Sequence, residues 1–194
     1  MQIERIAVIG AGPLGRAIAC LAARAGLATV LEDVNSETLD SALAAIRARV
    51  DSAIAASEIT RQEGDAVFDR ISTSRSIEDA MRAAEFIIDT TIDELETKLE
   101  VFTIFDKFAL PGAILASCTA SLSVADIATI TFRAERCFGM RFAMSESKLK
   151  RVEIIRSTRN AVDAVETCVH VARRLGLDET IVSDTMGAMR EGKN

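Results

Sequence analysis

Short apolar runs alternate with segments of helical periodicity along most of this 194-residue chain. The apolar runs have the length of buried strands, and strands are expected at residues 5–10, 28–33, 85–90, 113–117, 136–142, 151–157 and 180–184. Between several of them, apolar residues recur every three or four positions, as on one face of an amphipathic helix. This alternation predicts an α/β fold of the Rossmann type, with a doubly wound and mostly parallel sheet.

The helices are predicted from their apolar stripes and their start and stop signals. The first is expected to end at Gly26, and a long second helix is expected to start at Ser36. A further helix begins near residue 95, and Ser123 starts a short one with a Ser-x-x-Asp pattern that is typical of a capped helix. The last helix is predicted from the stripe formed by Val162, Val165, Val169 and Ala172.

Composition and charge narrow the class of protein. One domain is expected over residues 1–184, followed by a short tail at 185–194. The net charge of −6 and the lack of a basic patch disfavour nucleic acid, and no apolar run is long enough to span a membrane. The four cysteines show no CxxC spacing, so the chain is expected to be cytoplasmic and to hold no metal.

A glycine motif follows the first expected strand and opens the first expected helix. The segment VIGAGPLGRAIA holds this GxGxxG motif at residues 10–15, in which the residues expected to bind a cofactor are Gly10, Gly12, Pro13, Leu14 and Gly15. Such glycines allow a tight turn, close approach of a pyrophosphate and close packing of helix on strand. Asp33 ends the second expected strand about 20 residues further on, where an acid binds the ribose hydroxyls of a dinucleotide. The alternative, a glycine-rich turn without a ligand, does not account for this acid.

The residues around Asp33 also favour one cofactor over the other. Glu32 adds negative charge, and residues 34–36 contain no arginine that would bind a 2′-phosphate. NAD is therefore expected as the cofactor, rather than NADP.

Four segments resemble the NAD-binding domain of the 3-hydroxyacyl-CoA dehydrogenase family over nearly the whole chain. They are GAGPLGRAIACLAARAGLATVLED, FIIDTTIDELETKLEVFTIFDKF, ILASCTASLSVADIA and RCFGMRFAMSESKLKRVEIIRS. The resemblance implies a fold without the family's C-terminal helical domain, and NAD-dependent oxidation of 3-hydroxyacyl-CoA as the family's reaction. It also implies that Asp93, a shortened form of the family's glutamate near the nicotinamide ribose, and Lys98 belong to the cofactor site.

The catalytic positions depart from the family's pattern. The family uses a histidine that takes the hydroxyl proton and a glutamate that orients it. Glu153 occupies the glutamate position, but Arg141 occupies that of the histidine, and Ala120 that of a substrate-binding serine. A guanidinium stays protonated and has no acceptor lone pair, so Arg141 is unable to act as the general base. Arg141 and Glu153 either pair with each other or form an anion site.

Three functional hypotheses remain open at this stage. The chain is an NAD(H)-binding protein whose family activity is lost or weak, or an active oxidoreductase on a small anionic or acyl substrate, or the nucleotide-binding half of a split dehydrogenase. Because the family's helical domain would follow the tail, a homodimer or a separate helical partner is expected to cover the site. His170 is expected on a solvated helix face, and Cys118 as a buried apolar filler.

Overall fold

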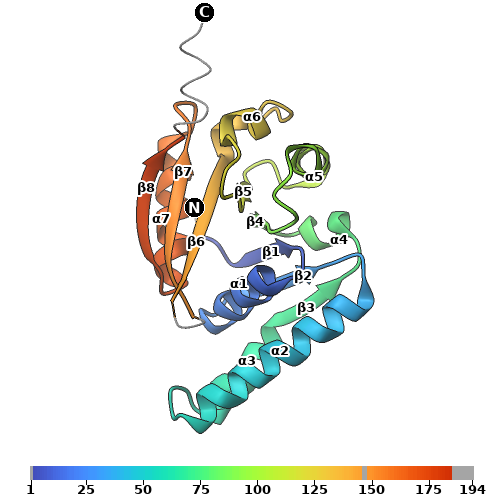
Figure 1. Ribbon diagram of the computed structural model, residues 1–194, viewed down its shortest axis with the longest axis vertical. Coiled ribbons are helices and arrows are strands. Elements are labelled where there is room, and N and C mark those ends of the chain that lie inside the picture. The colour runs from blue at the N-terminus through green and yellow to red at the C-terminus, as the bar shows by residue number, and fades with distance from the viewer. Residues whose placement is uncertain (1, 146–147, 185–194) are drawn as a thin grey trace, which may run out of the picture.

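An eight-stranded sheet forms the centre of the computed structural model, which describes residues 2–145 and 148–184 (Figure 1). Its strand order is β3-β2-β1-β4-β5-β6-β7-β8. The strands are β1 (Arg5–Ile9), β2 (Ala28–Glu32), β3 (Ile71–Ser74), β4 (Phe86–Asp89), β5 (Ile114–Ser117), β6 (Cys137–Ser145), β7 (Lys148–Arg156) and β8 (Asp178–Ser183). All neighbouring pairs are parallel except β6 and β7, so the prediction of a mostly parallel sheet is confirmed.

Helices cover both faces of this sheet. They are α1 (Pro13–Arg24), α2 (Ser36–Ala55), α3 (Arg61–Arg70), α4 (Ile77–Met81), α5 (Leu95–Phe108), α6 (Val124–Ala128) and α7 (Val162–Arg174), with a 3₁₀ turn at Ala134–Arg136. Buried residues of α1, α2, α3 and α7 share one apolar cluster, and those of α4, α5 and α6 share another. The α2–α3 pair extends to one end of the molecule in Figure 1.

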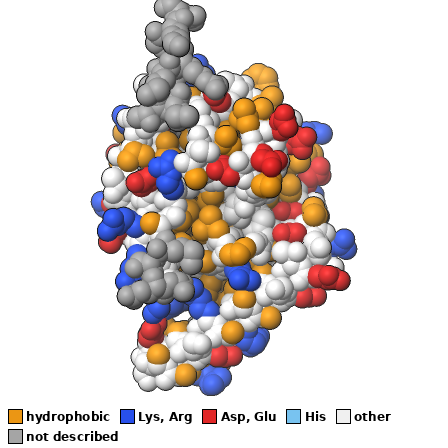
Figure 2. Space-filling view, in the orientation of Figure 1, with side chains coloured by type: hydrophobic (Ala, Val, Ile, Leu, Met, Phe, Trp, Pro, Cys, Tyr) orange, Lys and Arg blue, Asp and Glu red, His pale blue; other side chains and the backbone are white. Residues whose placement is uncertain are grey.

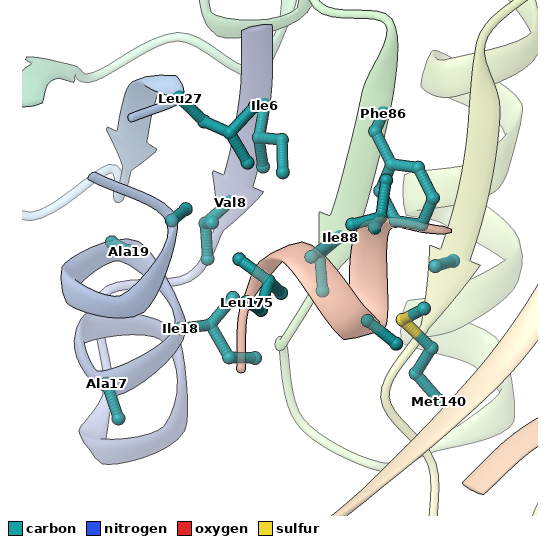
Figure 3. Close-up of a cluster of buried hydrophobic side chains, with 14 of the residues drawn as sticks. Ile6, Val8, Ala17, Ile18, Ala19, Leu27, Phe86, Ile88, Met140 and Leu175 are labelled. Carbon is teal, nitrogen blue, oxygen red and sulfur yellow. The ribbon is translucent and has the colours of Figure 1, made fainter. Parts of the chain in front are cut away.

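The larger cluster packs α1 and α7 against the middle of the sheet (Figure 3). Ile18 of α1 and Leu175, directly after α7, face Val8 of β1 and Ile88 of β4 in this layer. Ile18, Val8 and Ile88 are fully buried. Burying one such aliphatic side chain contributes about 1.5–3 kcal/mol, so this layer fixes α1 firmly on the sheet.

The strand order places a switch point between β1 and β4. The chain leaves β1 for β2 on one side and returns to β4 on the other, so the connections after β1 and β4 diverge at the carboxyl ends of these strands. Dinucleotides bind across such switch points in doubly wound folds. No helix within the described ranges combines the length and apolarity needed to cross a membrane.

Some local features differ from the predictions. Strand β3 and helix α4 were not expected from the sequence, whereas α2 starts at Ser36 as predicted, with Asn35 as its N-cap. In α7 the predicted stripe is confirmed at Val165 and Ala172, which are buried, and at Val169, which packs partly buried against the core, but Val162 is 73% exposed. The buried face of α7 consists of Ala164, Val165, Thr167, Cys168, Val171 and Ala172. The expected tail at 185–194 lies outside the described residues.

Candidate functional site

The glycine loop joins β1 to α1 at the switch point. Its backbone conformation and close contacts require glycine at two of its positions. Gly10 has a positive φ of 96°, which favours glycine, and a side chain there would come 2.9 Å from Thr90 Oγ1. A side chain at Gly15 would overlap the carbonyl oxygen of Gly10. By contrast, a Cβ atom on Gly12 would meet no described atom within 4 Å. The backbone at Gly12 is therefore open to close approach by a ligand.

The N-terminus of α1 lies at the same loop. Gly12 is its N-cap, Pro13 its first residue, and no side chain from the described residues caps it. The first N–H groups of a helix have no partner inside the helix, and together with the helix dipole they bind anions. Leu14 and Gly15 supply such N–H groups here. These features fit the pyrophosphate of a dinucleotide.

Asp33 connects the glycine loop to the start of α2. Its Oδ2 atom accepts the Ala11 N–H at 3.1 Å, and its Oδ1 atom accepts the Asn35 N–H at 3.0 Å. The side chain is only half-buried. Each carboxylate oxygen has a second lone pair, so Asp33 fits the expected role of binding ribose hydroxyls.

Glu32 lies directly before Asp33, and its burial was not predicted from the sequence. It is 2% exposed, and its Oε1 atom has no hydrogen-bond partner among the described residues. Burial raises the pKa of Glu32, and the charge of Asp33 raises it further. The Gly10 N–H lowers this pKa by a smaller amount, and the resulting value is about 7. A polar residue at a strand end gives no sequence signal of such burial.

A buried ion pair lies beneath the loop that follows β4. Lys98 Nζ is 2.8 Å from Asp89 Oδ2, and both side chains are fully buried. The lysine also donates to the carbonyl oxygen of Thr91 at 2.9 Å, and Asp89 accepts from Ser117 Oγ at 2.9 Å. Lys98 was expected in the cofactor site. Its ammonium group is enclosed by protein, so the geometry favours positioning of the loop over direct contact with a cofactor.

Asp93 lies in that loop, which it ties to the loop after β5. Its Oδ2 atom accepts the Ala120 N–H at 2.9 Å, and its side chain is exposed. Acidic side chains gather in Figure 2 over the region of α5 in Figure 1. The exposed acids at the start of α5 are Asp93, Glu94, Glu96 and Glu100.

Arg141 and Glu153 face each other across β6 and β7, where they are register partners. Arg141 Nη1 lies 2.6 Å from Glu153 Oε2, and Nη2 donates to the Ala120 carbonyl oxygen at 3.1 Å. The two side chains are 46% and 41% exposed. They line a cavity of about 460 Å³ together with residues such as Ser121, Leu122, Ile155 and Ser183. Of the two interpretations drawn from the sequence, the ion pair is present.

Two further residues lie where the sequence predicted them. Cys118 is buried, and burial raises the pKa of its thiol well above the ordinary value, so it is a poor nucleophile. His170 is exposed on α7. Neither residue supplies a proton acceptor beside Arg141.

The fold and the glycine loop together define a Rossmann-type dinucleotide-binding protein. The family model for the NAD-binding domain of 3-hydroxyacyl-CoA dehydrogenase matches residues 5–185. The chain belongs to this family, and residues 5–185 form its NAD-binding domain.

Its relatives agree with this assignment. The chain is 32% identical over 187 residues to a probable 3-hydroxybutyryl-CoA dehydrogenase from Bacillus subtilis, which covers 96% of the chain and 65% of the relative. It is 29% identical to the mitochondrial hydroxyacyl-coenzyme A dehydrogenase of Mus musculus, over 95% of the chain and 60% of the relative. The chain thus spans less than two thirds of these relatives.

A solved structure shows the same fold. The crystal structure of 3-hydroxybutyryl-CoA dehydrogenase from Escherichia coli K12 superposes with a TM-score of 0.91 at 27% identity, over 95% of this chain and 39% of that one.

Proposed function

We propose that this protein binds NAD(H) through the glycine loop and Asp33, and that the reaction of its family is lost or severely weakened. In this proposal the N-terminus of α1 binds the pyrophosphate, and Asp33 binds the adenosine ribose. Asp93 lies on the nicotinamide side, while Lys98 positions its loop from below. The bound cofactor would supply hydride transfer at its nicotinamide ring.

The main support for the proposal is that Arg141 is bound to Glu153 and to the carbonyl oxygen of Ala120. Oxidising a hydroxyl group requires an acceptor for its proton, and the guanidinium has no lone pair to offer. Glu153 is held at 2.6 Å by Arg141, whose second nitrogen is bound to the Ala120 carbonyl. Ala120, at the position of the family's substrate-binding serine, has only a methyl group and provides no hydroxyl to bind a substrate. Removing a general base alone lowers a rate by about 10²–10⁴-fold.

The test compares turnover with cofactor binding in the same protein. Wild type should bind NADH in calorimetry, yet reduce acetoacetyl-CoA far below the ~10 s⁻¹ median of ordinary enzymes. Arg141→His, alone and with Ala120→Ser, should raise that rate without strengthening NADH binding. Arg151→His is a matched control, because Arg151 is an exposed cation on β7 outside the cavity. Turnover near the median by wild type would refute the loss of activity.

A second candidate is an active oxidoreductase on an anionic hydroxy or oxo substrate. The cavity of about 460 Å³ beside Arg141 favours it, since a guanidinium binds carboxylates in bidentate fashion. Glu153 would then release Arg141 and take part in proton transfer. NADH oxidation with a panel of free oxo acids distinguishes this candidate, because rates with such acids should vanish in Arg141→Gln.

Self-association is the remaining part of the proposal. A homodimer, or a separate helical partner, would cover the apolar residues near the cleft, among them the exposed Ile92. Light scattering with and without NAD measures the oligomeric state. A monomer in both conditions, with no partner recovered in a pull-down, would contradict this part alone.

A further inference from the structure

Two acids on strands of this sheet are buried, but only one of them has its charge compensated in full. Asp89 accepts from Lys98, Thr91 and Ser117. Glu32 is 2% exposed, and its Oε1 atom has no hydrogen-bond partner within the described part of the chain. A buried carboxylate without an ion pair is costly to keep charged, and such groups take up a proton instead.

Glu32 also lies at the base of the glycine loop. It is the register partner of Ile9, and its backbone carbonyl accepts the Gly10 N–H at 2.8 Å. The next residue, Asp33, accepts the Ala11 N–H. Two consecutive acids therefore flank the loop that is proposed to receive a pyrophosphate, and any charge on Glu32 opposes that of the ligand.

We propose that Glu32 sets the affinity for NAD(H) through its protonation: the phosphates bind more tightly when its carboxyl is neutral, so binding takes up a proton. This inference rests on the proposed cofactor site. It assigns to Glu32 a positioning and affinity-determining role, without direct participation in the reaction.

The charged groups around Glu32 agree with such a role. The neighbouring charge directly after β2 is Asp33, and the glycine loop contributes the Gly10 N–H. Arg75, in the turn after β3, is engaged with the Val34 carbonyl at 3.3 Å. Across β1, Asp89 and Lys98 are paired with each other. A pKa of about 7 places the titration of Glu32 near neutrality before the ligand adds its own negative charge.

The linkage has a defined sign. An anionic ligand raises the pKa of a nearby carboxyl further, so affinity should fall as the pH rises through neutrality. The loss is about tenfold for each unit by which bound cofactor raises that pKa. Asp33→Ala would not reproduce this effect, because it removes a ribose-binding group.

The experiment is calorimetry of NADH binding from about pH 6 to about pH 8, in two buffers of different ionisation enthalpy. Wild type should take up a substantial fraction of a proton near neutrality and bind more weakly at the alkaline end. Glu32→Gln, a neutral variant of nearly the same shape, should keep the acid-side affinity at every pH. Glu37→Gln is the matched control, since Glu37 is exposed in the first turn of α2. It should keep the wild-type slope.

Different failures separate this inference from the proposed function. NADH binding without proton uptake by wild type would overturn the inference alone. An unchanged slope in Glu32→Gln would also overturn it, whereas no binding at any pH would overturn both. The buffer comparison needs only wild type, so the absence of proton uptake would still overturn the inference if Glu32→Gln fails to fold.

Discussion

Two ion pairs of similar length differ sharply in their surroundings. Lys98 and Asp89 lie 2.8 Å apart with both side chains fully buried, beneath the cofactor side of the cleft. Arg141 and Glu153 lie 2.6 Å apart and are nearly half exposed, at the position proposed for the family's catalytic pair. A buried pair is costly to break, whereas an exposed pair contributes little to stability. The cofactor side is therefore fixed by the fold, while the other side is free to change its chemistry.

The largest effect is expected from breaking the buried pair. Lys98→Met should lower the free energy of unfolding by about 3–5 kcal/mol, because Asp89 is left charged in the interior. Lys107→Met, an exposed lysine on the same helix, should change it by less than about 1 kcal/mol. Urea denaturation measures both. Equal, small effects would mean that Asp89 is not held by Lys98.

The next effect separates the fold from the cofactor site within one loop. Gly15→Ala should cost about 2–3 kcal/mol, because its methyl group would overlap the Gly10 carbonyl. Gly12→Ala has open space around it, so it should melt close to wild type and still bind NADH more weakly. Thermal melts and calorimetry check the pair. Strong destabilisation by Gly12→Ala would contradict the proposal that Gly12 is required for ligand binding rather than for the fold.

The sequence predicted the glycine loop and Asp33 because their signals are local and depend on backbone needs. It did not predict β3, since the segment Ile71–Ser74 is short and three of its four residues are polar. The sequence predicted only part of the buried face of α7, because that face also uses small residues such as Ala164 and Cys168, which carry a weak apolar signal.

The burial of Lys98 and Glu32 was also not predictable from the sequence. A lysine is usually exposed, and its enclosure depends on Asp89 and Thr91, which come from another element. For Glu32, the decisive feature is that its Oε1 atom finds no hydrogen-bond partner among the residues that the structure describes, which only three-dimensional packing reveals.

A moderate effect is expected at Asp33. Asp33→Ala should weaken NAD binding by about tenfold or more, because charge-assisted hydrogen bonds to the ribose are removed, and should affect NADP less. Asp40→Ala, an exposed acid on α2, serves as the control. Calorimetry with both cofactors provides the comparison. Equal affinities of wild type for NAD and NADP would contradict the assignment.

The smallest effect is expected at the exposed pair. Glu153→Gln should change the free energy of unfolding by no more than about 1 kcal/mol and leave NADH binding unchanged. Denaturation and calorimetry on one preparation are sufficient. A loss of more than about 2 kcal/mol would show that this pair is as structural as the buried one.

The most direct test of the central claim measures NADH binding and acetoacetyl-CoA reduction on one sample of wild-type protein. We expect saturable NADH binding together with turnover at least about 10²-fold below the ordinary median of ~10 s⁻¹. Saturable binding with turnover near that median would contradict it, because the exposed side of the cleft would then supply a proton donor for the reduction, the group that accepts the proton in the oxidation, despite Arg141.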